Sequence, residues 1–441
     1  MAQNSMLKEE RAAAANQSGG SMRSMLIIGA LFFIFGFVTW LNSVLIPYLK
    51  IACELNNFES YLVAFAFYVS YLVMAIPSAW VLKKTGFKKG MSLGLAVMAV
   101  GALIFVPAAM TRTYLFFLIG LFIQGTGLAV LQTAVNPYVT ILGPRESAAK
   151  RISIMGICNK VAGALAPLIL GAIVLENADA LVNTLGSMSA AQQAVELDAL
   201  ATKVIMPYII MAGILVVLAV LVSFSALPEI DTDQEDETVA TANTNKTSIL
   251  QFPHVLLGAF TLFLYVGVEV MAGDTVISYG AAQGVDLSTA KFFTTYTMVA
   301  MLVGYVIGII AIPTFISQSR ALQVSAVLGV LFVLVALFTD GYTSVLFISL
   351  LGLANALMWP AIWPLAIADL GRFTKIGSSL LIMGIAGGAI LPLLYGWLAD
   401  TISPQQAYWI MIPCYLVILY FAVYGHKIRT KQPVVSGNLP L

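Results

Sequence analysis

Twelve apolar stretches, each long enough to cross a bilayer as a helix, decide what this chain can fold into. A spanning helix needs about 20 predominantly apolar residues. Hydrophobic residues make up 60% of the sequence and charged residues only 10%, whereas soluble domains carry about 25% charged residues. We therefore predict an all-α integral membrane protein. The expected spans are residues 25–47, 60–83, 90–111, 114–142, 152–175, 205–227, 254–278, 290–315, 322–339, 343–369, 378–399 and 406–425.

Basic residues separate the two sides of the predicted membrane. Of the 22 lysines and arginines, 17 fall on the side that carries both chain ends, 4 fall on the other side, and Lys160 alone lies deep inside a span. Positively charged loops stay in the cytoplasm. Both termini are therefore expected there, with the protein in the cytoplasmic (inner) membrane. The first 24 residues are polar, so no cleaved signal peptide is expected.

A nine-residue segment occurs twice, which indicates two related halves. Residues 163–171 read GALAPLILG and residues 388–396 read GAILPLLYG, an offset of 225 positions. We predict two pseudo-symmetric six-helix bundles with a substrate site where they meet. The expected parts are a cytoplasmic tail at 1–24, a first bundle at 25–228, a polar, acidic linker at 229–250, a second bundle at 251–426 and a cytoplasmic tail at 427–441.

The repeated segment falls in the fifth and eleventh spans and has two structural interpretations. Its proline and glycines predict matched bends in the two helices. They also suit simple close packing of helices, because glycine lets two backbones approach. Outside the spans, the long segment 177–203 is expected to contain a short surface helix over Met188–Leu200.

Polar and aromatic side chains recur on single faces of several spans. Residues spaced three or four positions apart share one helix face. We predict that these faces line a water-filled cavity, where amides hydrogen-bond a polyhydroxylated solute and rings stack on its C–H surface. The alternatives are amides bonded between neighbouring helices and tryptophans anchored at the membrane surface. The candidate substrate-binding residues are Asn42, Gln132, Asn136, Asn159, Tyr265, Asn355, Trp359 and Trp363.

Three ionisable residues lie within the spans, where a charge is costly and therefore marks a functional position. They are Lys160, Glu269 and Asp274, and we predict all three as coupling residues. A carboxylate partner would keep a buried ammonium charged, and Glu269 is the best candidate partner for Lys160. Alternatively, Lys160 forms a salt bridge that locks the two bundles together without touching the substrate.

Composition narrows the classes of function. The net charge of +1 gives no sign of a nucleic-acid partner, and the three cysteines and two histidines form no metal-binding pattern. No arginine lies within a span, which favours a neutral solute over an anion. The leading prediction is a monomeric sugar transporter without a cofactor. The alternatives are an exporter of small amphipathic compounds and a sensor without transport. A membrane enzyme would need an acid–base pair or nucleophile at the membrane face, and no histidine is suitably placed, so no enzyme is expected.

Segments along the whole chain resemble the fucose permease and glucose/galactose permease family. The resemblance extends over about residues 25–425 and implies the major facilitator fold, with two six-helix bundles working by alternating access. It implies a neutral hexose or deoxyhexose of the glucose, galactose and fucose class as the substrate, moved inward. The segments that carry it are Leu131-Gln-Thr-Ala-Val-Asn-Pro-Tyr-Val-Thr-Ile-Leu-Gly143, Leu41-Asn-Ser-Val-Leu-Ile-Pro47, Ile76-Pro-Ser-Ala-Trp-Val-Leu-Lys-Lys84, Tyr265-Val-Gly-Val-Glu-Val270 and the region Asp369–Ser379.

The chain departs from this family at positions that matter for coupling. In fucose permeases, proton coupling is tied to two carboxylates at positions that Ser43 and Gln132 occupy here, and neither side chain carries a proton. Lys160 replaces a serine of the family's fifth span. We count Ser43 with the coupling positions for this reason. Three mechanisms remain open: uniport with Lys160 as a fixed internal cation, proton coupling through Glu269 and Lys160, and sodium coupling through Glu269, Asn42 and backbone carbonyls.

Overall fold

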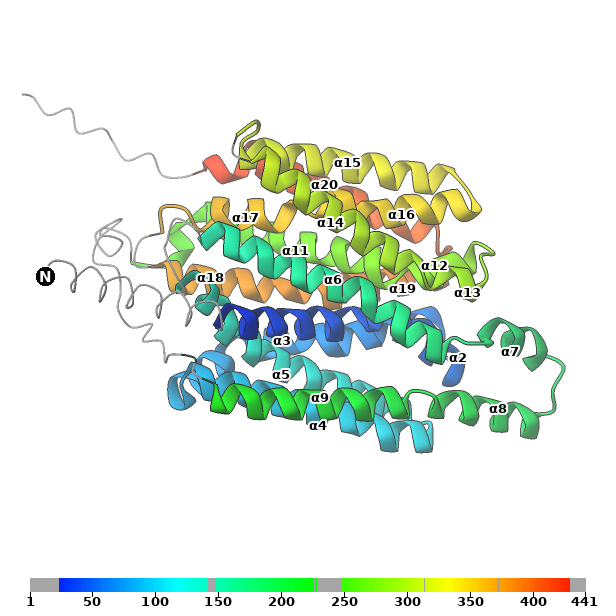
Figure 1. Ribbon diagram of the computed structural model, residues 1–441. Helices are drawn as coiled ribbons and strands as arrows, with labels where there is room; N and C mark the ends of the chain where they lie inside the picture. Colours follow the sequence, from blue (N-terminus) through cyan, green and yellow to red (C-terminus); the bar gives the residue numbers. More distant parts are fainter. Residues whose placement is uncertain are drawn as a thin grey trace, which may run out of the picture.

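The computed structural model describes residues 24–141, 148–225, 227, 247–312, 314–370 and 373–428. Twelve helical segments within these ranges are long and apolar enough to cross a membrane. Each overlaps one of the twelve predicted spans, which confirms the predicted helical membrane fold. The helices run roughly parallel to one common axis, with most of the first half of the chain on one side and most of the second half on the other (Figure 1).

The first half of the chain begins with a helix over residues 24–40. The predicted surface helix is present as α8, and Ser189 and Gln192 form its N-terminal capping box. The helices that follow residue 40 are α2 (Asn42–Ala52), α3 (Asn57–Thr85), α4 (Phe87–Thr111), α5 (Tyr114–Ile141), α6 (Ala148–Val174), α7 (Ala178–Leu185), α8 (Ala190–Thr202) and α9 (Ile205–Phe224).

The second half begins at a short 3-10 turn, and most of the predicted linker at 229–250 lies outside the described residues. The linker and tail boundaries therefore stay predictions. The elements of this half are η2 (Ile249–Gln251), α11 (Pro253–Asp274), α12 (Val276–Ala282), α13 (Leu287–Ala290), α14 (Phe293–Ala311), α15 (Gln318–Phe338), α16 (Gly341–Asn355), α17 (Met358–Ile367), α18 (Thr374–Met383), η4 (Gly384–Ala386), α19 (Gly387–Thr401), η5 (Gln406–Ile410), α20 (Met411–Val423) and η6 (Gly425–Lys427).

The first, seventh and tenth spans are each interrupted beside a buried polar residue. One break directly precedes Asn42, and the other two directly follow Asp274 and Asn355. At the break in the seventh span, the Thr275 hydroxyl donates to the carbonyl oxygen of Met271 at 2.6 Å. A side-chain bond of this kind competes with the helix ladder and bends helices. Interrupted spans bring polar groups to the interior of a bundle, where a ligand can reach them.

The repeated nonapeptide brings helices into close contact. α6 runs through the first copy as one helix, whereas η4 interrupts the helical run just before the second copy, so the two spans do not bend alike. A Cβ added to Gly388 would lie 3.1 Å from the Tyr68 ring, and one added to Gly396 would lie 2.5 Å from the Tyr61 ring. Both contacts join α19 to α3. They support the close-packing interpretation, because only glycine leaves room for the opposing ring.

The two halves are joined by hydrogen bonds at one end of the bundle. We call this the loop end, because it carries α7 and α8, and the opposite end, near Ser24, the terminal end (Figure 1). At the loop end, Asp400 of α19 accepts hydrogen bonds from the backbone N–H groups of Asn57 and Phe58, at 3.1 and 2.7 Å. These donors lie at the start of α3, where a carboxylate satisfies free N–H groups and interacts favourably with the helix dipole.

A second aspartate makes the same kind of contact in the opposite direction, from the first half to the second. Asp179 of α7 accepts hydrogen bonds from the backbone N–H groups of Leu287 and Ser288, at 2.8 and 3.0 Å, at the start of α13. Each half therefore supplies one aspartate to a helix N-terminus of the other. We call Asp179 and Asp400 the loop-end clasp. The clasp holds the two halves together at the loop end.

Packing of the first span on α6 gives a prediction for stability. A Cβ at Gly36 would lie 2.0 Å from the carbonyl oxygen of Asn159, so Gly36→Ala must push two backbones apart. Overpacking of this kind costs about 1–3 kcal/mol, and we expect a lower melting temperature for the purified variant. Gly213→Ala in α9 is the matched control, because nothing lies within 4 Å of a Cβ there. Equal melting temperatures for the two variants would contradict the packing described.

Candidate substrate and coupling site

An ion pair joins the two halves inside the bundle. The Nζ atom of Lys160 in α6 lies 2.7 Å from Oε1 of Glu269 in α11, and the two side chains are 9% and 12% exposed. The ammonium also lies 4.8 Å from the centroid of the Trp40 ring, within the range of a cation–π contact. The partner predicted for Lys160 is therefore present. Pairing compensates a charge that would be very costly alone at this depth.

Three aromatic rings form a row next to this pair. Tyr265 lies one helical turn before Glu269 on α11, and its ring centroid is 6.4 Å from that of Trp359. Trp359 and Trp363 of α17 stack with centroids 5.5 Å apart and planes inclined by 23°. Tyr265 is buried and the two indoles are half-buried. The row offers flat faces of the kind that stack on the C–H surface of a ring-shaped polyol.

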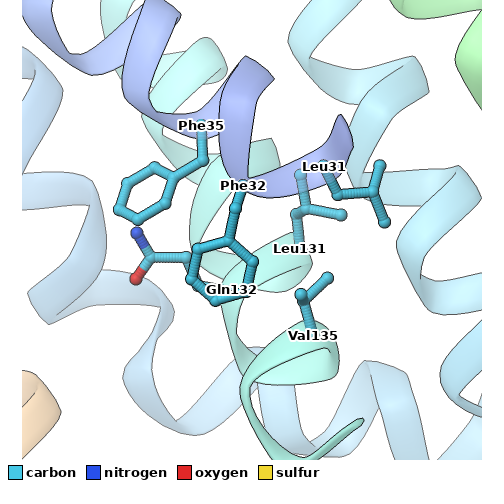
Figure 2. Close-up of a pocket in the computed structure, with 6 residues that line it drawn as sticks. All are labelled: Leu31, Phe32, Phe35, Leu131, Gln132 and Val135. Carbon is cyan, nitrogen blue, oxygen red and sulfur yellow. The ribbon is translucent and has the colours of Figure 1, made fainter. Parts of the chain in front are cut away.

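Gln132 of α5 lines a small cleft in the first half. Its Nε2 donates a hydrogen bond to the Tyr71 hydroxyl at 3.1 Å, and Figure 2 shows its amide beside two phenylalanine rings. The cleft has room for about one water molecule, so it is too small for a hexose in this conformation. The side chain of Asn136, further along α5, lies outside the described residues. The cleft residues are Leu31, Phe32, Phe35, Leu131, Gln132 and Val135.

Three further candidates lie on the first span and α6. Asn42 is 1% exposed, and neither its Oδ1 nor its Nδ2 has a hydrogen-bond partner among the described residues. The Ser43 hydroxyl donates to the carbonyl oxygen of Trp40 at 2.8 Å. Nδ2 of Asn159 donates to the carbonyl oxygen of Phe32 at 3.4 Å. Of these three residues, Asn42 is thus the one whose side chain has both polar atoms available for a ligand.

Asn355 of α16 makes its contact within the second half. Its Oδ1 accepts a hydrogen bond from the Tyr415 hydroxyl of α20 at 2.9 Å, and its Nδ2 has no partner among the described residues. This bond is of the helix-to-helix kind that we considered as the alternative to a cavity. The last candidate, Asp274, is fully buried at the end of α11.

Sequence reasoning missed three aromatic residues that contact the site, Trp40, Tyr68 and Tyr71. A signal for two of them was available. Tyr61, Tyr68 and Tyr71 follow one another at intervals of seven and three residues, which places them on one face of the second span. Trp40 lies two residues before Asn42 in the most polar part of the first span. Its ring contacts the Lys160 ammonium only because α6 packs against the first span, and the sequence alone does not predict this packing.

Comparison with known proteins identifies the family. The model of the Major Facilitator Superfamily matches residues 28–373 of the 441-residue chain. The chain belongs to the Major Facilitator Superfamily. This confirms the predicted major facilitator fold, with twelve membrane-spanning helices in two pseudo-symmetric six-helix bundles. Members of the superfamily are permeases, so the protein is a transporter and not an enzyme.

Individual relatives of this major facilitator protein agree with the resemblance found in its sequence. It is 35% identical over 402 residues to a glucose/galactose transporter of Brucella abortus, covering 90% of this chain and 92% of the relative. It is 29% identical over 437 residues to the L-fucose-proton symporter of Escherichia coli, covering 97% and 100%. The crystal structure of the transporter FucP in the outward conformation superposes with a TM-score of 0.69 at 28% identity, covering 92% and 99% of the two chains.

Proposed function

We propose that this transporter moves a neutral hexose or deoxyhexose, of the glucose, galactose and fucose class, inward across the cytoplasmic membrane by alternating access. The observation that carries the proposal is the Lys160–Glu269 pair, which joins the two halves at 2.7 Å. The charges of Lys160 and Glu269 cancel, so the pair adds hydrogen-bonding groups to the site without adding a net charge. Such a site suits a polyhydroxylated neutral solute better than an anion. The relatives named for glucose, galactose and fucose support the same substrate class.

The candidate residues divide into three groups in this proposal. The amides of Asn42, Gln132, Asn136 and Asn159 supply hydrogen bonds to hydroxyls, together with Nδ2 of Asn355, since Oδ1 of Asn355 is taken by Tyr415. The rings of Tyr265, Trp359 and Trp363 supply a stacking face. Lys160 and Glu269 already lie between the two halves, where the solute would bind. When their hydrogen bond to each other breaks, the ammonium and the carboxylate can each bond the solute.

The orientation of the protein is part of the proposal. Both termini lie in the cytoplasm, so the loop end faces away from it, and the clasp of Asp179 and Asp400 closes the outer side. One chain contains both halves of the site, and we propose that it works as a monomer in the bilayer. Labelling of a single cysteine at Val195, 68% exposed in α8, by a membrane-impermeant maleimide added to intact cells checks the orientation. If the maleimide did not label that cysteine, the proposed orientation would be contradicted.

The substrate prediction is tested by uptake into proteoliposomes that contain the purified protein. We expect saturable entry of at least one of glucose, galactose, fucose, mannose and N-acetylglucosamine. We also expect a preference of about tenfold or more over the corresponding uronic acid, because a carboxylate would add an uncompensated charge to the site. Equal entry of the acid would overturn the neutral-substrate proposal. Net movement of an amphipathic drug, without any sugar, would favour the exporter.

A further inference from the structure

A buried carboxyl group at the interface between the halves has no hydrogen-bond partner in the part of the chain that the structure describes. Asp274 ends α11, is 0% exposed, and neither Oδ1 nor Oδ2 has a hydrogen-bond partner among the described residues. The adjacent residue, Gly273, packs on the Trp40 ring, which a Cβ there would approach to 2.1 Å. The end of α11, which carries Asp274, therefore lies where the seventh span meets the first.

The charged and titratable groups around Asp274 come from three helices. Glu269 lies on the same helix, five residues before it, and is occupied by Lys160 of α6. From α3, the phenols of Tyr61 and Tyr68 lie within electrostatic reach of the carboxyl group. The hydroxyl of Tyr68, like the amide of Asn42, is buried without a partner among the described residues. Within the described ranges, the surroundings thus hold neutral polar groups, one more acid, and one cation, Lys160, which is paired with Glu269.

A charge at this position would be very unfavourable. An ionised carboxylate that is removed from water without donors or a counter-ion costs many kcal/mol, and such a group takes up a proton instead. A protonated carboxyl group costs much less, because only one polar O–H and one carbonyl lose their water. The closed arrangement seen here is therefore compatible with the neutral acid and incompatible with the anion.

We propose that Asp274 is the proton-binding residue of this transporter. This rests on the proposed function and adds to it a coupling ion and the residue that carries it. While the loop end is open, the carboxylate takes one proton from water at that side and becomes a carboxylic acid. Closure of the loop end buries the neutral acid. When the terminal end opens, the acid returns the proton to water there and becomes the carboxylate again. Ser43 and Gln132 have no proton to exchange in this way.

The first test is spectroscopic and does not depend on sugar transport. Infrared spectra of the purified protein at neutral pH are expected to contain the C=O stretching band of a protonated carboxylic acid, and Asp274→Asn is expected to remove it. Asp198→Asn is the control, since the Asp198 side chain is 65% exposed and pairs with Arg112. Should Asp274→Asn fail to fold, a hydrophobic carbodiimide, which modifies protonated buried carboxyl groups, should label Asp274 in the wild type. Absence of both the band and the label would overturn the proposal.

The second test measures coupling as an accumulation ratio. With the membrane potential held at zero, one proton for each neutral sugar gives tenfold accumulation for each unit of pH difference across the membrane. We expect wild-type proteoliposomes to approach this ratio and Asp274→Asn to equilibrate at a ratio of one. Accumulation by Asp274→Asn, or accumulation by the wild type with sodium alone, would overturn the proposal. A wild type that moves no sugar at all contradicts the proposed function, and the infrared result then decides the protonation of Asp274 by itself.

Discussion

Lys160→Met is expected to reduce sugar uptake by two orders of magnitude or more. The substitution keeps most of the side-chain volume but leaves the Glu269 carboxylate, 12% exposed, without its partner at 2.7 Å. Breaking one side of a buried ion pair costs about 3–5 kcal/mol, and each 1.4 kcal/mol corresponds to a factor of ten. Glu269→Gln should have an effect of similar size. Initial rates of uptake into proteoliposomes give the comparison.

Two further variants separate a binding role from a structural one. The double variant Lys160→Met with Glu269→Gln removes both charges, so its melting temperature should return toward the wild-type value while uptake stays low. Lys84→Met is the matched control, since Lys84 is exposed and lies over Trp80. Lys160→Ser tests the alternative in which the Lys160 salt bridge only locks the two bundles together and does not touch the substrate. Unchanged sugar affinity with altered turnover in that variant would favour the lock over a binding role.

Removal of the loop-end clasp is expected to open the loop end. Asp179→Ala and Asp400→Ala each remove a carboxylate from a helix N-terminus of the opposite half. Because these groups are partly exposed, each contact is worth about 1 kcal/mol. The double variant should therefore shift the balance between loop-end-closed and loop-end-open states by about 30-fold. Spin labels at Val195 and Thr343, one on each half and both exposed, report the shift as a longer distance.

The control for the clasp is Asp198→Ala at the same end of the molecule. Asp198 pairs with Arg112 inside the first half, so its removal should leave the distance distribution unchanged. The native Cys53 at this end should interfere little with labelling, because burial raises the pKa of its thiol to about 11, against the opposing effect of Arg112, and the thiolate is the reactive form. An unchanged distance in the double clasp variant would contradict a role for the clasp in holding the loop end closed.

The spans could be predicted from the sequence because lipid forces every apolar stretch of this length into a helix. The pairing of Lys160 with Glu269 was also predictable. Few charges lie within the spans, and a lone charge there has few partners to choose from. The linker at 229–250 was clear from its composition, although its structure lies largely outside the described residues.

The remaining contacts depend on how the helices rotate and bend against one another. Oδ1 of Asn355 accepts a hydrogen bond from Tyr415 of α20, a contact within the second half that the sequence pattern does not predict. The break after Asp274 lies at Thr275, whose hydroxyl bonds the carbonyl oxygen of Met271, and threonine is a common residue without a distinctive sequence signal. The clasp joins aspartates to backbone groups 108 and 342 residues away, a separation that no local pattern predicts.

The most direct test of the site is exchange of a radiolabelled neutral hexose across proteoliposomes, measured side by side for the wild type and Glu269→Gln. We predict rapid exchange by the wild type, competed by unlabelled sugar, and a rate at least 100-fold lower for the variant. Equal exchange by the two proteins would contradict a sugar site built around the Lys160–Glu269 pair.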